Sequence, residues 1–170
     1  MTQFSVGAFE SVAEGVYVAV AEPEGVNIGL VVGESGAMVI DTGSSPAQGS
    51  AIRAAAEAIA GRPITAVLVT HGHFDHLFGL AGFAGVPSFG HESLAAAMDS
   101  PATITAATEL GVEPAQLVAP ESLFALARAI DVGGRRVEIM HFGPGHTDGD
   151  VVAYLPELDL IFTGDLLESA

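Results

Sequence analysis

Three histidines and a carboxylate lie within one short segment of the chain and have the composition of a metal-binding site. Residues 70–76 read Thr-His-Gly-His-Phe-Asp-His, which places side chains of this kind at His71, His73, Asp75 and His76. Imidazole nitrogens and carboxylate oxygens are ligands that Zn²⁺ and Fe²⁺ accept, and a loop leaving a strand can turn alternate side chains toward two adjacent ions. A purely structural role is the weaker interpretation, because every buried histidine would need its own hydrogen-bond partner. The segment therefore predicts a metal site.

Two glycine-rich segments in the second half of the chain offer further ligands. Residues 143–150 read Gly-Pro-Gly-His-Thr-Asp-Gly-Asp and present His146, and residues 163–165 read Thr-Gly-Asp and present Asp165. Both follow segments with the pattern of strands, and loops at strand ends are where a rigid sheet can hold distant residues together. We therefore expect His146 and Asp165 to join the same site.

The surrounding segments predict strands and helices in alternation, as in a layered α/β domain. Residues 64–70 are almost wholly apolar and rich in β-branched side chains, which is typical of a strand covered on both faces. Further strands are predicted at 16–20, 28–32, 37–40, 86–89, 137–142, 151–155 and 160–163, and helices at 46–60, 92–98 and 102–111. Residues 113–120 have the pattern of a connection, residues 121–130 fit helix or strand equally, and Gly133-Gly134 indicates a hairpin turn.

In order and spacing, these ligand segments resemble the motifs of the metallo-β-lactamase-fold hydrolases, which read H-x-H-x-D-H, then G-H-T, then G-D. Residues 71–76 match the first motif, His146 the second and Asp165 the third, and the resemblance extends from about Val16 to Leu167. It implies a single domain over residues 1–170 with an αββα sandwich fold and the metals at one edge of its two sheets. Within the family, the chain is more similar to the glyoxalase II and lactonase side than to the periplasmic β-lactamases.

The resemblance also implies a role for each ligand. It assigns a first ion to His71, His73 and His146, a second ion to Asp75 and His76, and the bridge between the ions to Asp165. The family's usual seventh ligand is a histidine near the C-terminus, and this chain ends at Ala170 without one. We therefore expect a fragment that lacks the last part of the fold and has an incomplete second site; the alternative is a second site that is completed by water or by another chain.

The implied chemistry is hydrolysis of an ester, thioester, lactone or lactam. A catalytic metal lowers the pKa of bound water to about 7, so that hydroxide becomes available to attack a carbonyl carbon at neutral pH. Two zinc ions are expected, with Fe²⁺ or Mn²⁺ as alternatives. Asp75 is expected to orient the hydroxide and to pass its proton onward.

Two other functions remain open at this point. Persulfide dioxygenases of the same fold bind one iron through the residues that match His71, His146 and Asp165, a two-histidine, one-carboxylate set. A non-enzymatic interpretation is an inactive metal-binding scaffold, in which an exposed sheet edge favours homo-oligomers.

Three further polar positions have simpler interpretations. Asp41-Thr42-Gly43 resembles the active-site segment of aspartic proteases, but such enzymes need two carboxylates sharing a proton and one chain offers one copy. A tight turn is the stronger interpretation, with Asp41 as a hydrogen-bond partner of a ligand histidine. His91 and His141 are expected to be structural rather than ligating, although His141 is close enough in sequence to the His146 loop to line a pocket.

The amino-acid composition limits the kinds of molecule that the protein is expected to bind. Acidic residues outnumber basic ones 21 to 5 and the formal charge is −16, which disfavours nucleic acid and favours a small-molecule substrate. The absence of cysteine excludes thiolate ligands and disulfides. The chain has no apolar run long enough for a membrane span and its first 15 residues do not resemble a secretory signal, so a cytoplasmic location and no membrane partner are expected.

Overall fold

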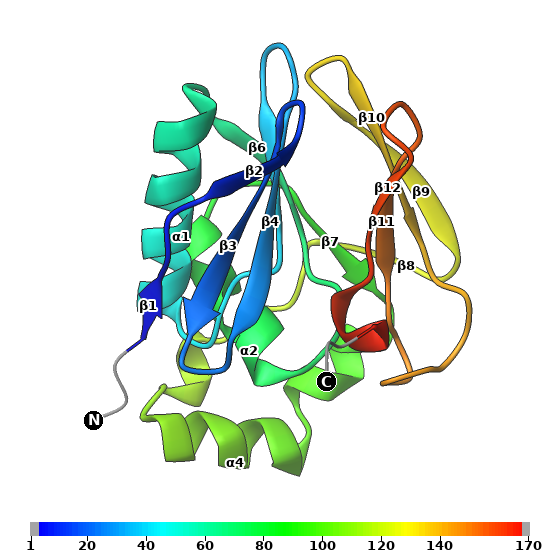
Figure 1. The fold of residues 1–170 in the computed structure, drawn as a ribbon. Coiled ribbons are helices and arrows are strands. Elements are labelled where there is room, and N and C mark those ends of the chain that lie inside the picture. Colours follow the sequence, from blue (N-terminus) through cyan, green and yellow to red (C-terminus); the bar gives the residue numbers. More distant parts are fainter. Residues whose placement is uncertain (1–3, 168–170) are drawn as a thin grey trace.

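The computed structural model describes residues 4–167, which form two β-sheets packed face to face (Figure 1). The larger sheet has eight strands in the order β1-β3-β4-β5-β6-β7-β8, and β2 also pairs with β3. Its strands are β1 (Ser5–Val6), β2 (Glu10–Ala13), β3 (Val16–Glu22), β4 (Val26–Val32), β5 (Ala37–Ile40), β6 (Ile64–Leu68), β7 (Ser88–His91) and β8 (Ser122–Phe124). Strands β5 to β8 run parallel, so that the segments following β5 and β6 leave the same edge of the sheet.

The smaller sheet is antiparallel and has four strands in the order β12-β11-β10-β9. Its strands are β9 (Ala127–Val132), β10 (Arg135–Met140), β11 (Val152–Leu155) and β12 (Leu160–Phe162). The turn between β9 and β10 is formed by Gly133 and Gly134, whose φ angles of 58° and 92° lie in the region that glycine adopts without steric cost. This hairpin was predicted from the glycine pair.

Helix α1 (Pro46–Ala60) covers one face of the larger sheet (Figure 1). The Ser45 side chain caps its N-terminus by accepting a hydrogen bond from the Gln48 amide, and Gly61 ends it in a left-handed conformation with φ of 64°. Ile52 and Ala56 are buried on its sheet-facing side. The predicted helix at 46–60 is therefore confirmed at both ends.

The remaining helices are short; all but the last lie in the connections between β6, β7 and β8, and the last follows β12 of the smaller sheet. They comprise α2 (Phe74–Leu77), η1 (Phe78–Phe83), α3 (Leu94–Met98), α4 (Pro101–Leu110), η2 (Pro114–Gln116) and η3 (Gly164–Leu166). Among the described residues, no helix is long and apolar enough to cross a membrane.

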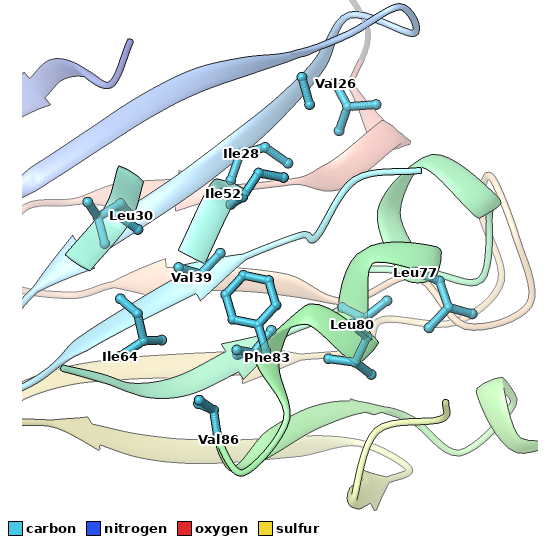
Figure 2. Close-up of a cluster of buried hydrophobic side chains, with 14 of the residues drawn as sticks. Val26, Ile28, Leu30, Val39, Ile52, Ile64, Leu77, Leu80, Phe83 and Val86 are labelled. Carbon is cyan, nitrogen blue, oxygen red and sulfur yellow. The ribbon is translucent and has the colours of Figure 1, made fainter. Parts of the chain in front are cut away.

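Two apolar cores lie on the two faces of the larger sheet. Between this sheet and the helices, side chains such as Ile28, Leu30 and Val39 pack against Ile52 and Phe83 (Figure 2). The core between the two sheets contains the side chains of Val31, Met38, Ile40, Leu68, Val137 and Ile139. Burial of each such side chain stabilises the fold by about 1.5–3 kcal/mol, which makes the central strands a rigid support for the segments that leave them.

The predicted α/β architecture is confirmed, with differences in detail. The undecided segment 121–130 is extended, because its residues pair with β7 and β10, and β1 and β2 were not predicted. One helical layer and both sheets of the expected αββα sandwich are present, and within residues 4–167 no helix covers the outer face of the smaller sheet (Figure 1).

Candidate metal centre

The predicted ligands lie at one end of the two sheets, where α2 and the segment after β12 meet (Figure 1). His71 and His73 follow β6, and Asp75 and His76 lie in α2. His146 lies in the loop between β10 and β11, and Asp165 lies in η3 directly after β12. Each sheet therefore contributes side chains to the same edge.

Four of these side chains converge on one point. His71, His73, His146 and Asp165 each offer one ligand atom, and these atoms lie within 4.8 Å of one another. His146 Nε2 and His73 Nδ1 are 3.0 Å apart. His71 is buried, whereas His73 and His146 are exposed. Such a donor set is suitable for a transition-metal ion.

Asp165 is also close to His76. Its Oδ2 atom is 3.7 Å from both His71 Nε2 and His146 Nε2, and its Oδ1 atom is 3.3 Å from His76 Nε2. Asp75 Oδ2 is 3.8 Å from the same His76 nitrogen. Asp165 thus directs Oδ2 toward His71 and His146 and Oδ1 toward His76, and the His76 ring itself lies against His71, with ring centroids 4.1 Å apart.

Behind the ligands, Asp41 and Thr70 form a buried hydrogen-bond network. The Asp41 carboxylate accepts hydrogen bonds from the Thr70 amide at 2.8 Å, from the Thr70 hydroxyl at 2.9 Å and from His76 Nδ1 at 2.9 Å. Asp41 has a φ of 67°, an unusual conformation for a residue with a side chain, and it is held there by these bonds. With one copy per chain and its carboxylate fully bonded, Asp41 has the geometry of a supporting residue and not that of a protease dyad.

This network orients the His71 ring. The hydroxyl of Thr70 has one proton, which it donates to Asp41, so its oxygen accepts from His71 Nδ1 at a distance of 3.1 Å. His71 therefore carries its proton on Nδ1 and turns the Nε2 lone pair toward Asp165 and His146. A carboxylate or hydroxyl that fixes the far nitrogen in this way is a common feature of metal-binding histidines.

Two buried nitrogens lack hydrogen-bond partners among the described residues, and both face the centre. These atoms are His71 Nε2 and His76 Nε2. A buried polar atom without a partner carries a cost of about 1–3 kcal/mol, so their position calls for an explanation. Metal coordination supplies one, and the residues present fit a metal ion on this ground.

The electrostatics separate the two histidines. Burial, and then the charge on His76, lower the pKa of His71 to about 4, so that His71 is neutral at neutral pH. Burial also acts to lower the pKa of His76, but Asp41, Asp165 and Asp75 outweigh it and raise that pKa to about 10. The approach of His76 in turn holds the pKa of Asp165 at about 2, against the opposing effect of burial.

A cleft of about 590 Å³ opens beside this centre, between the two sheets. Asp75, His76 and Asp165 line its end, and apolar side chains of both sheets, including Val26 and Phe162, line the rest. His141 is not part of this lining, contrary to the possibility raised by its sequence position.

The loop that carries His146 is organised by Asp150, which sequence reasoning did not single out. Asp150 is buried and accepts hydrogen bonds from the Thr147 amide at 2.8 Å and the Thr147 hydroxyl at 2.9 Å. The adjacent Val151 amide donates to the Thr70 carbonyl at 2.8 Å, which ties the loop to the residue preceding His71. Thr70 was also overlooked, although a polar residue ending an apolar strand was a usable signal.

Comparison with known proteins agrees with this geometry. A sequence model described as the metallo-beta-lactamase superfamily matches residues 21–170. The crystal structure of a metallo-beta-lactamase from Hirschia baltica superimposes with a TM-score of 0.65 at 22% identity, covering 95% of this chain and 71% of that one. A metallo-beta-lactamase from Pontibacter korlensis gives a TM-score of 0.64 at 24% identity, with 91% and 68% covered. At these identities the likeness concerns the fold alone, and no curated protein sequence matches the chain.

Proposed function

Because the chain belongs to the metallo-β-lactamase superfamily, we propose that it is a hydrolase that uses two metal ions, most simply zinc, to cleave an ester, thioester, lactone or lactam. In this proposal, His71, His73 and His146 hold the first ion and Asp75 and His76 hold the second. Asp165 bridges the two ions. Residues 1–170 thus supply each of these ligands. They do not include the seventh ligand, the histidine that the resemblance leads us to expect.

The observation that carries the proposal is the convergence of four ligand atoms within 4.8 Å, next to two buried nitrogens without partners. Bound metal supplies an activated water at neutral pH and an electrophile for the substrate oxygen. The protein's contribution is to fix the ligands: Thr70 sets the proton position on His71, and Asp41 does the same for His76.

Asp75 is the proposed proton carrier. It lies at the end of the cleft, near His76, and its side chain is partly exposed. A carboxylate in this position can hold the attacking water by a hydrogen bond, accept its proton and deliver that proton to the leaving group. Asp41 does not serve this purpose, because it is buried and its carboxylate oxygens are engaged with Thr70 and His76.

The lining of the cleft favours substrates without negative charge. Glu24, Asp41, Asp75 and Asp165 line it, and within the described part of the chain no lysine or arginine does. Two bound ions would offset the charges of Asp75 and Asp165, but the described residues lining the cleft would still offer no lysine or arginine to pair with a substrate carboxylate, whereas an uncharged acyl group can lie against the apolar walls. We therefore propose neutral esters and lactones ahead of penicillin-like lactams, which carry a carboxylate.

Metal reconstitution tests this function. Protein treated with a chelator is titrated with Zn²⁺, Mn²⁺ or Fe²⁺, and hydrolysis of a neutral lactone, a thioester and a β-lactam is measured at each metal ratio. We expect metal-dependent turnover that is greatest on the neutral lactone, and its loss in His146→Ala but not in Asp148→Ala, a change in the same loop. Metal binding without turnover on any substrate would instead favour the scaffold interpretation.

A mono-iron persulfide dioxygenase is the second candidate, and one observation favours it. Asp165 Oδ2 is equidistant, at 3.7 Å, from His71 Nε2 and His146 Nε2, which is the arrangement of a two-histidine, one-carboxylate set. This set does not include His73. Iron-loaded His73→Ala protein that consumed oxygen in the presence of a persulfide would support the dioxygenase, whereas loss of all activity in that variant would support the hydrolase.

A further inference from the structure

Two histidines outside the metal centre form a stacked pair between the two sheets. His91 is the last residue of β7 in the larger sheet, and His141 directly follows β10 in the smaller sheet. Their ring centroids are 4.1 Å apart and their planes are inclined by 30°. The pair therefore connects the two sheets at the base of the loop that carries His146.

His141 closes the base of this loop by a hydrogen bond. Its Nδ1 atom is 2.9 Å from the carbonyl oxygen of Asp150, to which the N–H donates. The loop of residues 142–149 therefore begins and ends beside this hydrogen bond. The backbone of His141 is also held, because its amide donates to the Leu126 carbonyl at 2.7 Å, just before β9.

His91 supports the loop from the larger sheet. It is only 8% exposed, and its Nδ1 atom lies 3.0 Å from the Ser93 hydroxyl. The backbone of Gly149 passes so close that a Cβ atom there would lie 2.7 Å from His91 Nδ1 and 2.0 Å from Ser93 Oγ. The loop therefore rests against His91 and Ser93 without space for a side chain at this position.

His146 itself has little other support. Its side chain is 28% exposed, and its hydrogen-bonding contact among the described residues is with His73, another candidate ligand. The position of the His146 ring is consequently set by the loop backbone. Metal–ligand distances tolerate errors of only about 0.2 Å, so small shifts of this backbone weaken binding.

We propose that the stacked pair of His91 and His141 positions His146 for the first metal ion, so that both histidines are positioning residues for metal binding. This inference rests on the metal site of the proposed function. It differs from a general stabilising role, because the pair holds one ligand of that site against the sheet that carries His71.

The test compares zinc affinity with stability in the full chain. Variants His91→Ala, His141→Ala, His91→Phe and His141→Phe are titrated with zinc against a chromophoric chelator, and with Co²⁺ while the visible absorption is recorded. Thr103→Ala is the matched control: Thr103 is also 8% exposed and hydrogen-bonded, at 2.7 Å to the Ala97 carbonyl, but it lies on α4 outside this loop and the stacked pair. Thermal unfolding after chelation is measured for each protein.

We expect both alanine variants to lose about tenfold in zinc affinity and to show an altered Co²⁺ spectrum, as for other residues that orient a metal ligand. His91→Phe keeps the stacked ring and should restore most of the affinity. His141→Phe keeps the ring but removes the donor to Asp150, so its affinity should still fall. This variant decides the question where an alanine variant does not fold.

Unchanged zinc affinity and Co²⁺ spectra in all four variants, with unfolding temperatures lowered as in Thr103→Ala, would overturn the positioning role and leave the metal site intact. A wild-type protein that binds neither zinc nor Co²⁺ would overturn the proposed function itself. The same titration therefore distinguishes the two failures.

Discussion

The two sheets contribute to the candidate metal centre in different ways. The larger sheet supplies His71 and His76 from within the core, where each is at most 2% exposed and bonded to Thr70 or Asp41. The smaller sheet supplies His146 and Asp165 from loops, with side chains that are 28% and 29% exposed. One half is fixed by packing, and the other by hydrogen bonds within short loops.

This difference suggests that the buried half and the loop half have different roles in metal binding. The buried half determines where the centre lies and which ring nitrogens face it, because its side chains cannot rotate without disrupting the core. The loop half determines how well the coordination closes around an ion, because loops have lower local stability than central strands. Loss of a buried ligand such as His71 should therefore affect both folding and metal binding, and loss of the exposed loop ligand His146 should affect metal binding alone.

The largest expected effect on zinc affinity comes from single variants that each remove one ligand, either from the buried half or from the loop half. His71→Ala and His146→Ala should each lower zinc affinity by more than about 100-fold, since even residues that only orient ligands are worth about 10- to 100-fold. His71→Ala should also destabilise the chelated protein by about 2 kcal/mol, because it leaves a cavity and removes the hydrogen bond that the Thr70 hydroxyl oxygen accepts. Zinc competition measures the affinity, and thermal unfolding measures the stability. Equal destabilisation by both variants would contradict the difference between the buried half and the loop half.

Replacement of Asp41 should mainly affect folding and the second metal position. Asp41→Ala removes the partner of Thr70 and of His76 and should destabilise the protein by about 3 kcal/mol, whereas Asp41→Asn keeps an acceptor and should cost less. Asp159→Ala is the control, because Asp159 shares the left-handed conformation with φ of 49° but is exposed. Chemical denaturation gives the free energies, and similar losses at both positions would assign the effect to backbone conformation alone.

The stability of chelated protein should pass through a maximum near pH 6.5. The pKa of His76 is raised from 6.5 to about 10, so its contribution is present below pH 6.5 and is lost as pH rises toward 10. The pKa of His71 is lowered from 6.5 to about 4, so its contribution is present above pH 6.5 and is lost as pH falls toward 4. His76→Gln should abolish the alkaline loss; an unchanged profile in this variant would contradict the assignment.

The smallest expected effect lies within the loop itself. Asp150→Ala removes the acceptor for Thr147 and should destabilise the chelated protein by about 1 kcal/mol while lowering zinc affinity several-fold. Asp148→Ala, an exposed change two residues away, should alter neither quantity. A response of similar size in both variants would show that the loop does not depend on Asp150.

The sequence was sufficient where structure depends on local signals. Helix α1 begins after a capping serine and ends at Gly61, and both features are visible in the sequence. The segment 121–130 was undecided, because its extended conformation results from pairing with β7 and β10. Strands β1 and β2 were missed for the same reason, since each is short and is defined by its pairing with β3.

The candidate centre shows the same division. By itself the sequence determined which residues have the chemistry of metal ligands and on which loops they lie, because residue type and spacing along one segment are local properties. Only the tertiary structure decided that Asp165 lies 3.7 Å from both His71 and His146, that Thr70 links Asp41 to His71, and that His91 stacks on His141. These relations join segments far apart in the chain, and their distances are set by how two sheets pack.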